Sequence, residues 1–410
     1  MGTVLPAELI SLLAGALGSL SLVNGHRFLK AMSVILALLL TICILLLKSR
    51  AALFSFVCGF LYLLLCFRFK HNHKWYFVLF LLAIAVIGTI LYFIRPASAM
   101  GRLYIWRVCL DMIKERPLGF GWNGFIHQYM YYQADYLSTH PNTIFNVLAD
   151  NVAFPYNEFL HTTISFGIPG LVLLLFVIWD TLSPHTYSSK DLIVKSLLVN
   201  YLVFSSFSYP TDAIYTCLLF PILTLLSRKG FLGPYVNILC GAIIVVATLL
   251  FIKRDTLERK IRNECFLYQE QRVDKLLHDE KEGLSLFPEL RELILARIPT
   301  DHLTRYSDYI LESARQCPNS ESICRAGDVM AMQGDVRAAL SYYDEASRMV
   351  PSRLTPRYKA FCLLLKNEQI EEAKAKGKEI LSMDLKIRSS EVIQIRNKVK
   401  KAMMEFNLMD

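Results

Sequence analysis

Long uncharged, apolar runs constrain this chain more than any other feature. Several contain about 15 to 22 residues, and a helix needs about 20 to cross the hydrocarbon core of a bilayer. Of the 410 residues, 54% are hydrophobic, and the mean hydropathy is +0.38, which is unusual for a soluble protein. The residues after Phe251 are charged and amphipathic instead. The chain is therefore predicted to be an all-α membrane protein with a soluble tail.

Eight segments are predicted to cross the membrane. They are residues 9–25, 31–47, 51–67, 75–94, 159–179, 196–209, 213–226 and 231–252. Loops rich in Lys and Arg favour the cytoplasm, and three such loops, at residues 26–30, 68–74 and 227–229, fall on one side. The loop at residues 95–156 and the whole tail are then predicted to lie on the other side. The net charge of +9 comes largely from span ends and the tail, which favours a membrane rather than nucleic acid as the partner.

The loop at residues 95–156 is polar, aromatic and arginine-bearing, and this composition between spans makes it the first candidate for function. Arg102 and Arg107 offer bidentate binding of a diphosphate. Ring faces for a sugar are offered by Trp106, Trp122 and Tyr132. The ordinary alternatives are an aromatic belt at the membrane surface and arginines that reach toward lipid headgroups. Because the loop has no acidic cluster and no His/Cys group, we predict no metal site.

The tail is predicted to contain a charged helical linker at residues 253–283 and a helical-repeat domain at residues 284–410. Small and apolar residues around Gly334 are spaced as in a tetratricopeptide repeat, in which two antiparallel helices touch at small side chains. The predicted units are a degenerate first repeat at 284–317, repeats at 320–351 and 354–383, and a basic capping helix at 389–404. Such stacked units commonly form binding surfaces, so we expect the tail to bind a partner such as an envelope protein.

Five short motifs occur in an order shared with a known family. They are Lys48-Ser49-Arg50-Ala51-Ala52, Gly101-Arg102 with Trp106, Pro117-Leu118-Gly119-Phe120-Gly121, Asn157-Glu158-Phe159-Leu160 and Gly167-Ile168-Pro169-Gly170-Leu171. In the order and spacing of these motifs and in predicted topology, residues 31–226 resemble the O-antigen ligase and polymerase family of bacterial inner-membrane glycosyltransferases. The tail resembles the exported extension of one branch of that family.

The resemblance implies a multi-spanning helical domain of the GT-C type in residues 1–252, with the loop at 95–156 in the periplasm. It implies transfer of a glycan from undecaprenyl diphosphate without a metal or another cofactor. A ligase passes the glycan to a lipid A–core acceptor, and a polymerase passes it to another lipid-linked glycan. By position, Arg50 and Arg102 match family arginines that hold the donor diphosphate and stabilise the leaving group. The expected stereochemical outcome is inversion.

The residue that activates the acceptor departs from the family pattern. Ligases of this family usually carry a histidine immediately before the Asn of the Asn-x-x-Leu segment, and this chain has Tyr156 before Asn157. Because a phenol is a weak base at neutral pH, Glu158, His161 and the loop residue His140 are the further candidates. Glu158 is the first choice, since an ionisable residue at the end of a membrane span is energetically unfavourable and commonly has a function. Asn157 is a further candidate for glycan contact.

Two functions of different classes are consistent with these patterns. The first is a lipid-linked glycan transferase, either ligase or polymerase. The second is a non-catalytic membrane anchor that presents the repeat domain to envelope proteins. Deleting residues 284–410 should separate them, since an enzyme is expected to keep some transfer and an anchor to lose all function. A transporter is disfavoured, because the spans hold few ionisable residues and show no inverted repeat.

Overall fold

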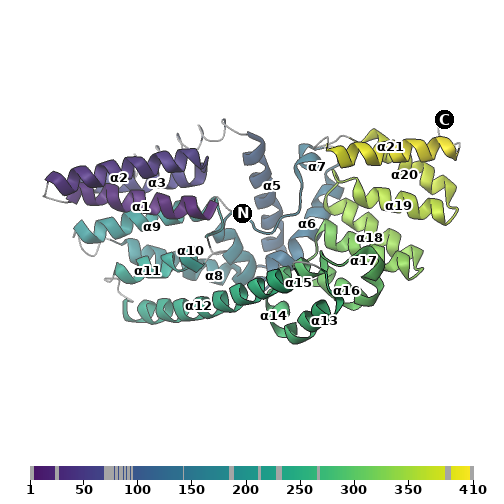
Figure 1. Cartoon of the computed structure of the whole chain (residues 1–410). Helices are drawn as coiled ribbons and strands as arrows, with labels where there is room; N and C mark the ends of the chain where they lie inside the picture. Colours follow the sequence, from purple (N-terminus) through teal and green to yellow (C-terminus); the bar gives the residue numbers. More distant parts are fainter. Residues whose placement is uncertain are drawn as a thin grey trace. The chain divides into compact units, whose positions relative to one another are not determined.

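The computed structural model of the chain is helical in the parts that it describes (Figure 1). These are residues 4–23, 27–68, 96–141, 143–183, 189–210, 214–227, 233–265, 268–383 and 389–406, together with isolated residues between 78 and 93. No strand occurs among these residues. The predicted all-α fold class is thus confirmed for the described part of the chain.

The chain divides into two compact units that do not follow the order of the sequence. The first, here called the apolar unit, comprises Met1–Arg102, Pro117–Gly119 and Phe154–Ile252. The second, here called the tail unit, comprises Leu103–Arg116, Phe120–Ala153 and Lys253–Asp410. Most of the loop between residues 95 and 156 therefore groups with the tail.

The apolar unit consists of helices with few charged residues. They are α1 (Val4–Val23), α2 (Arg27–Leu46), α3 (Arg50–Arg68), the start of α5 (Pro96–Glu115), α8 (Glu158–Leu182), α9 (Ser189–Ser205), α10 (Ile214–Cys217), α11 (Leu219–Leu226) and the first part of α12 (Gly233–Glu264). Helix α1 packs against α2, α3 and α9, and α3 packs against α9. Small residues allow this approach, since a Cβ on Gly59 would lie 2.8 Å from Asn200 Cβ. Asn200 Nδ2 in turn donates to Ser11 O at 3.2 Å, so that this buried amide has a partner.

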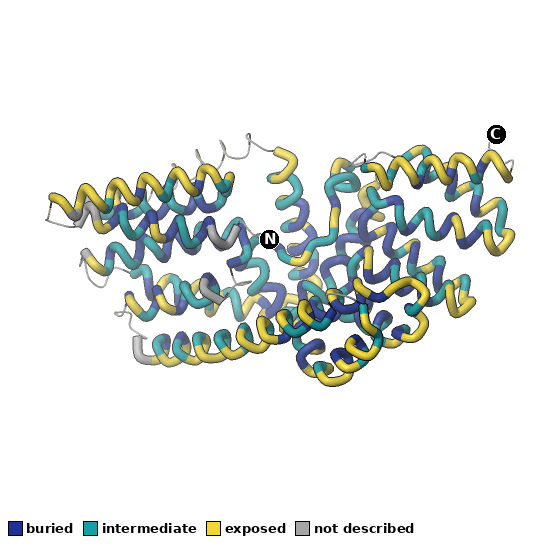
Figure 2. The backbone as a smooth tube through the Cα atoms, in the orientation of Figure 1, coloured by how far each residue is buried: buried dark blue, intermediate teal, exposed yellow. Residues whose placement is uncertain are grey.

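Two helices of the described residues are long and apolar enough to cross a membrane, Glu158–Leu182 and Tyr235–Glu264. They lie at the predicted spans 159–179 and 231–252. Shorter apolar helices, Ala7–Leu20, Lys30–Leu46 and Arg50–Cys66, lie at the first three predicted spans. Apolar side chains are exposed along α2 and α12, which are largely yellow and teal in Figure 2. Apolar surface of this extent indicates an environment other than water.

The predicted span 213–226 is not a single helix. The segment 213–226 is broken at Leu218 into α10 and α11, of which the longer has 8 residues. Pro221 explains the break, because a proline ring clashes with the carbonyl of a helical residue four positions earlier, here Cys217. The predicted span 75–94 lies outside the described residues, apart from isolated positions.

The tail unit joins most of α5 (Pro96–Glu115), α6 (Gly124–Thr139), α7 (Ile144–Leu148) and the end of α12 to the helices that follow. Those are α13 (Glu270–Asp279), α14 (Lys281–Leu286), α15 (Pro288–Leu295), the 3-10 helix η2 (Thr300–Tyr306), α16 (Ser307–Gln316), α17 (Ser320–Met332), α18 (Val336–Met349), α19 (Thr355–Lys366), α20 (Ile370–Ser382) and α21 (Ser390–Glu405). From α16 to α21, each helix packs against the next in the chain.

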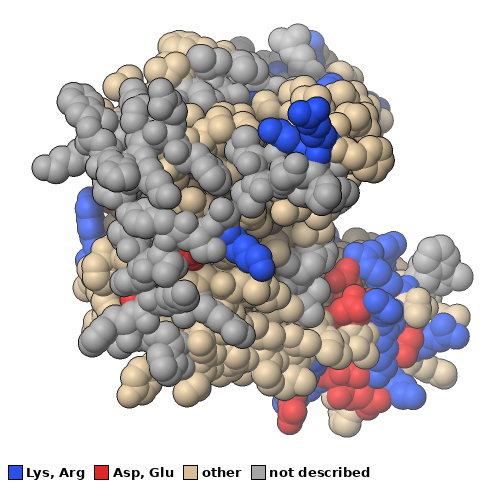
Figure 3. Space-filling model, turned by 90° about the vertical axis from the view of Figure 1, so that its left-hand side faces the viewer, with Lys and Arg blue, Asp and Glu red and all other residues tan. Residues whose placement is uncertain are grey.

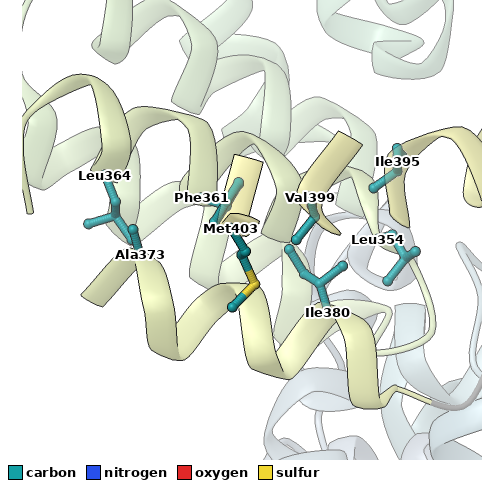
Figure 4. Close-up of a cluster of buried hydrophobic side chains, with 8 residues drawn as sticks. All are labelled: Leu354, Phe361, Leu364, Ala373, Ile380, Ile395, Val399 and Met403. Carbon is teal, nitrogen blue, oxygen red and sulfur yellow. The ribbon is translucent and has the colours of Figure 1, made fainter. Parts of the chain in front are cut away.

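The hairpin of α17 and α18 forms where the sequence predicts a repeat. Asn319 caps α17 with a capping box, and Gly334 turns the chain with a φ of 86°, which glycine adopts without strain. The helices touch at Gly327, where a Cβ would lie 2.7 Å from the ring of Tyr343. Helices are also present at 354–383 and 389–404, and Figure 4 shows their shared apolar core. That these hairpins are tetratricopeptide repeats stays a prediction.

Ion pairs between helices also hold the tail unit together. Examples are Lys260 with Glu280, Arg357 with Glu379 and Lys359 with Asp328. Figure 3 shows one face of the molecule, where basic and acidic side chains gather side by side in one region and most of the other coloured surface is uncharged. Surface pairs of this kind form readily in water and contribute modestly to stability.

Candidate functional site

Two arginines from separate helices come together in the apolar unit. Arg50 begins α3, and its Nη2 donates to Ser98 Oγ in the first turn of α5 at 3.1 Å. Arg102 lies one turn further along α5 and is half-buried. Burial, and then the positive charge of Arg50, lower the pKa of Arg102. The two guanidinium groups are thus close enough to repel each other, and a bound anion would relieve that repulsion.

An aromatic cluster lies beside Arg102. The guanidinium Cζ is 5.6 Å from the ring centroid of Tyr156, within the range of a cation–π contact. Tyr156 meets Tyr209 edge to face at 5.4 Å, and Tyr209 stacks on Phe154 at 4.6 Å. Tyr156 takes this position with a φ of 53°, a left-handed conformation that is uncommon outside glycine. A strained residue against a half-buried cation marks a candidate site.

The start of α8 brings three of the predicted site residues together. Asn157 caps the helix, since its Oδ1 accepts from Leu160 N at 3.0 Å while its Nδ2 donates to Ser206 O at 3.2 Å. Glu158 Oε2 and His161 Nδ1 are 3.3 Å apart, and Glu158 is only 9% exposed. A carboxylate and an imidazole in contact form a pair that can accept and release a proton.

The turn at Pro117–Gly119 fits into a kink of α8. Gly167 departs from helical dihedrals there with a φ of 72°, and Ile168 donates its N–H to Pro117 O at 2.8 Å. A Cβ on Gly119 would lie 2.6 Å from Gly167 N, and one on Gly167 would lie 2.5 Å from Leu118 C. Because only glycine fits at both places, two motifs that are far apart in the sequence form a single contact.

One comparison with known protein families bears on this site. A family model described as O-antigen ligase matches residues 35–175. These residues form an O-antigen ligase family domain. No curated protein and no solved structure matches the chain. The match confirms the family that the sequence motifs predict, and it includes both arginines, the start of α8 and the glycine contact.

Other predicted site residues of the O-antigen ligase domain lie in the tail unit. Arg107 and Trp122 are exposed, and Trp106 and Tyr132 are half-buried. Arg107 Nε is 3.9 Å from Asp111 Oδ2 in the next turn of α5. Burial, followed by a hydrogen bond with Glu115, raises the pKa of Tyr132 to about 12. The structure thus brings Arg50, Arg102 and Tyr156 together and groups these four residues with the tail.

Two residues beside the site were not predicted from the sequence. Tyr209 completes the aromatic cluster, and an aromatic residue at the end of an apolar run was its only signal. Glu8 of α1 is fully buried, and among the described residues neither of its carboxylate oxygens has a hydrogen-bond partner. Its charge interacts with that of Glu158. An acid at the start of the first apolar run was the available signal. Conversely, the predicted base His140 is exposed in the tail unit, where it stacks on Tyr136 at 4.3 Å.

Within the described part of the chain, no three His, Cys, Asp or Glu side chains are placed so that they could hold a metal ion. The polar groups at the site of the O-antigen ligase domain are guanidinium groups, phenols, an amide, a carboxylate and an imidazole. This set can bind a phosphate anion, contact a sugar and move one proton.

Proposed function

We propose that this chain is a membrane glycosyltransferase that moves a glycan from undecaprenyl diphosphate to an acceptor. The pair of Arg50 and Arg102, which converge from two helices of the matched family domain, is the observation that carries this proposal. A diphosphate has the charge and the oxygen geometry that guanidinium groups bind. The proposed acceptor is lipid A–core, as for an O-antigen ligase.

In the proposed step, an acceptor hydroxyl oxygen attacks the anomeric carbon of the donor sugar. The bond from that carbon to the diphosphate oxygen breaks, and undecaprenyl diphosphate leaves with the bonding electrons. Arg50 and Arg102 stabilise the negative charge that develops on the leaving oxygen. Because the hydroxyl attacks from the face opposite the leaving group, the anomeric configuration is inverted.

The proton of the acceptor hydroxyl passes to the pair of Glu158 and His161. Their contact at 3.3 Å lets the carboxylate take the proton directly or through the imidazole. Tyr156 has another role in this scheme, since its ring faces Arg102 and orients the guanidinium group. Asn157 fixes the first turn of α8 and so orients Glu158.

We place the reaction at the periplasmic face of the bacterial inner membrane, with the tail on the same side. The basic loops at 26–30, 68–74 and 227–229, which favour the cytoplasm, support this orientation. No metal or other cofactor takes part in the proposed reaction, because the guanidinium groups supply the positive charge that the leaving diphosphate needs.

Transfer from a synthetic undecaprenyl-diphosphate glycan tests the proposal. The full-length protein in nanodiscs would receive this donor with lipid A–core, or the donor alone, each with and without EDTA. We expect a single glycan block on lipid A–core, in equal yield with EDTA. A ladder of repeat units would assign a polymerase instead. No turnover by folded protein would favour a non-catalytic anchor, and loss of transfer in EDTA would contradict metal independence.

Substituting either arginine tests the roles within the site. Arg102→Ala and Arg50→Ala should each lower kcat about 100- to 1,000-fold, the usual effect of removing a group that stabilises a leaving charge. Arg102→Lys should recover little, because an ammonium group cannot bind a diphosphate bidentately. Lys114→Ala removes an exposed cation of α5 and should leave transfer unchanged. Normal transfer by both arginine variants at wild-type membrane levels would rule out the assigned roles.

A further inference from the structure

Three helices of the tail unit end at regular intervals along the sequence. Helix α14 ends at Leu286, α16 at Gln316 and α18 at Met349, so the ends are 30 and 33 residues apart (316 − 286 and 349 − 316). The last carbonyl groups of a helix have no partner within the helix. A stack of such hairpins therefore presents a row of backbone acceptors.

Two of these three helix ends accept a hydrogen bond from the loop around α6, and the third helix packs against α6. Asn123 Nδ2 donates to Leu286 O at 3.2 Å, and Gln133 Nε2 donates to Met349 O at 2.7 Å. Helix α6 also packs against α16, and the backbone of Gln316 at the end of α16 raises the pKa of His127 in part. Along the chain, Asn123, His127 and Gln133 follow the order of α14, α16 and α18.

Gln133 is the centre of this contact. Its side chain is fully buried, and Nε2 also donates to Asp150 O at 3.0 Å. The next loop residue, Asn151, accepts from Ser320 N at 3.0 Å and so satisfies the first amide of α17. The loop therefore provides partners at both open ends of the α17–α18 hairpin, where the chain enters and leaves it.

The charged rim of the contact links the same segments. Arg353 Nη2 is 3.1 Å from Asp150 Oδ1, and Arg353 Nη1 pairs with Glu321 of α17. One helix further along the row, α20 ends at Ser382, and there Arg396 of α21 donates to Met383 O. The row of helix ends from α14 to α20 thus has partners from this chain itself.

We propose that α6 of the same chain occupies the surface formed by the C-terminal ends of the tail helices. Through this contact, the tail positions the loop for glycan transfer. The positioning part rests on the function proposed above. Another protein could occupy this row only by displacing α6. Residues 284–410 would then be a component of the transferase, so that their deletion would not separate an enzyme from an anchor.

Helix α5 begins in the apolar unit, where it carries Arg102, and continues in the tail unit from Leu103. Tyr104 lies two residues after Arg102 on this helix and is buried in the tail unit. Its ring stacks on Phe145 of α7 at 5.0 Å and meets Tyr136 of α6 edge to face at 5.6 Å. Loss of order in α6 would therefore remove packing from the part of α5 adjacent to Arg102.

Hydrogen exchange of the full-length protein in nanodiscs tests the contact itself. Gln133→Met removes both donated hydrogen bonds and nearly preserves the side-chain volume. We expect exchange of residues 124–139 and of the last turn of α18 to become about 10- to 100-fold faster, because two buried carbonyls lose their partner. Gln128→Met, a half-buried position on the same helix, should leave exchange unchanged. Equal protection of α6 in Gln133→Met and the wild type would overturn the proposal.

A milder variant covers the case in which Gln133→Met fails to fold. Asn123→Ala should speed exchange at the end of α14 and in the first turn of α6, by less than Gln133→Met because Asn123 is only half-buried. Unchanged exchange at both places would overturn the proposed row of contacts.

Kinetics then test the positioning role. Gln133→Met should lower kcat at least tenfold while the amount of protein in the membrane is unchanged, and Gln133→His, which restores one donor, should recover part of the rate. Faster hydrogen exchange of α6 together with a wild-type kcat would overturn the positioning role. Failure of the wild type to transfer glycan would instead count against the proposed function, and exchange would decide the cis contact independently.

Discussion

The loop between residues 95 and 156 is held at two places by two different kinds of contact. In the apolar unit, Pro117–Gly119 is held by close backbone approach, because glycines let its backbone touch the kink at Gly167, where the Ile168 N–H donates to Pro117 O. In the tail unit, Gln133 and its neighbours are held by side-chain hydrogen bonds to helix ends. The difference reflects the surroundings. Helices rich in apolar side chains pack by close backbone approach, whereas a stack of short helices exposes carbonyl groups that amide side chains can satisfy.

A single substitution should destabilise the backbone contact at Gly167 more than the side-chain contacts of the tail unit. Gly167→Ala would place a Cβ 2.5 Å from backbone atoms at a φ of 72°, so both strain and overlap oppose it. We expect destabilisation by about 2 to 5 kcal/mol, measured as a lower thermal midpoint and less protein in the membrane.

Gly121→Ala is the matched control for this prediction. Gly121 has a φ of 86° but nothing within 4 Å of the added Cβ, so only backbone strain of about 1 kcal/mol is expected. Equal losses of stability in Gly167→Ala and Gly121→Ala would show that only the positive φ matters. The close backbone approach at Gly167 would then not hold the loop.

Charge reversal at the rim tests the polar contact at a smaller scale. Arg353→Glu replaces pairs with Asp150 and Glu321 by repulsion, and since these groups are partly exposed we expect a loss of about 1 kcal/mol. Limited proteolysis of the loop should become faster. The double variant Arg353→Glu with Asp150→Arg should restore part of the protection, and a purely additive result would argue against direct coupling.

The pH dependence of α6 gives the smallest expected effect. Burial lowers the pKa of His127, and the backbone of Gln316 opposes part of this shift. A histidine with a depressed folded pKa contributes stability above its unfolded pKa of about 6.5, and that stability is lost as the pH falls through the folded value. Corrected exchange of residues 124–139 should therefore be faster at about pH 5.5 than at about pH 7.5.

A variant without an ionisable group at position 127 tests whether His127 causes the pH dependence of exchange. His127→Gln keeps a donor and does not ionise, so the difference between the two pH values should shrink. A response equal to that of the wild type would assign it to another group.

Local signals in the sequence predicted much of the helical structure. The small and apolar residues around Gly334 predict a helical hairpin, and the structure has its turn there. The motifs at Pro117–Gly121 and Gly167–Leu171 indicated the family, and the family match confirms it. The hydrophobic pattern predicts the segment 213–226 as one span, and this prediction is wrong because Pro221 breaks the helix.

The loop–tail contact left no comparable signal. Its acceptors are the backbone carbonyls of Leu286 and Met349, and any residue can supply a carbonyl. Aromatic residues were equally ambiguous. Tyr129 is of a residue type that often contacts sugars, but it is fully buried, and its ring stacks on that of Phe125 at 4.6 Å between centroids.

The sequence by itself determined the helices, the apolar character of the first unit and the family, because spacing, capping and hydrophobicity act between near neighbours or through composition. Only the tertiary structure decided which helix ends meet which side chains, why Gly119 and Gly167 must both be glycines, and that Arg50 and Arg102 converge. Those relations depend on distances between segments remote in the chain, and such distances are fixed by packing rather than by local preference.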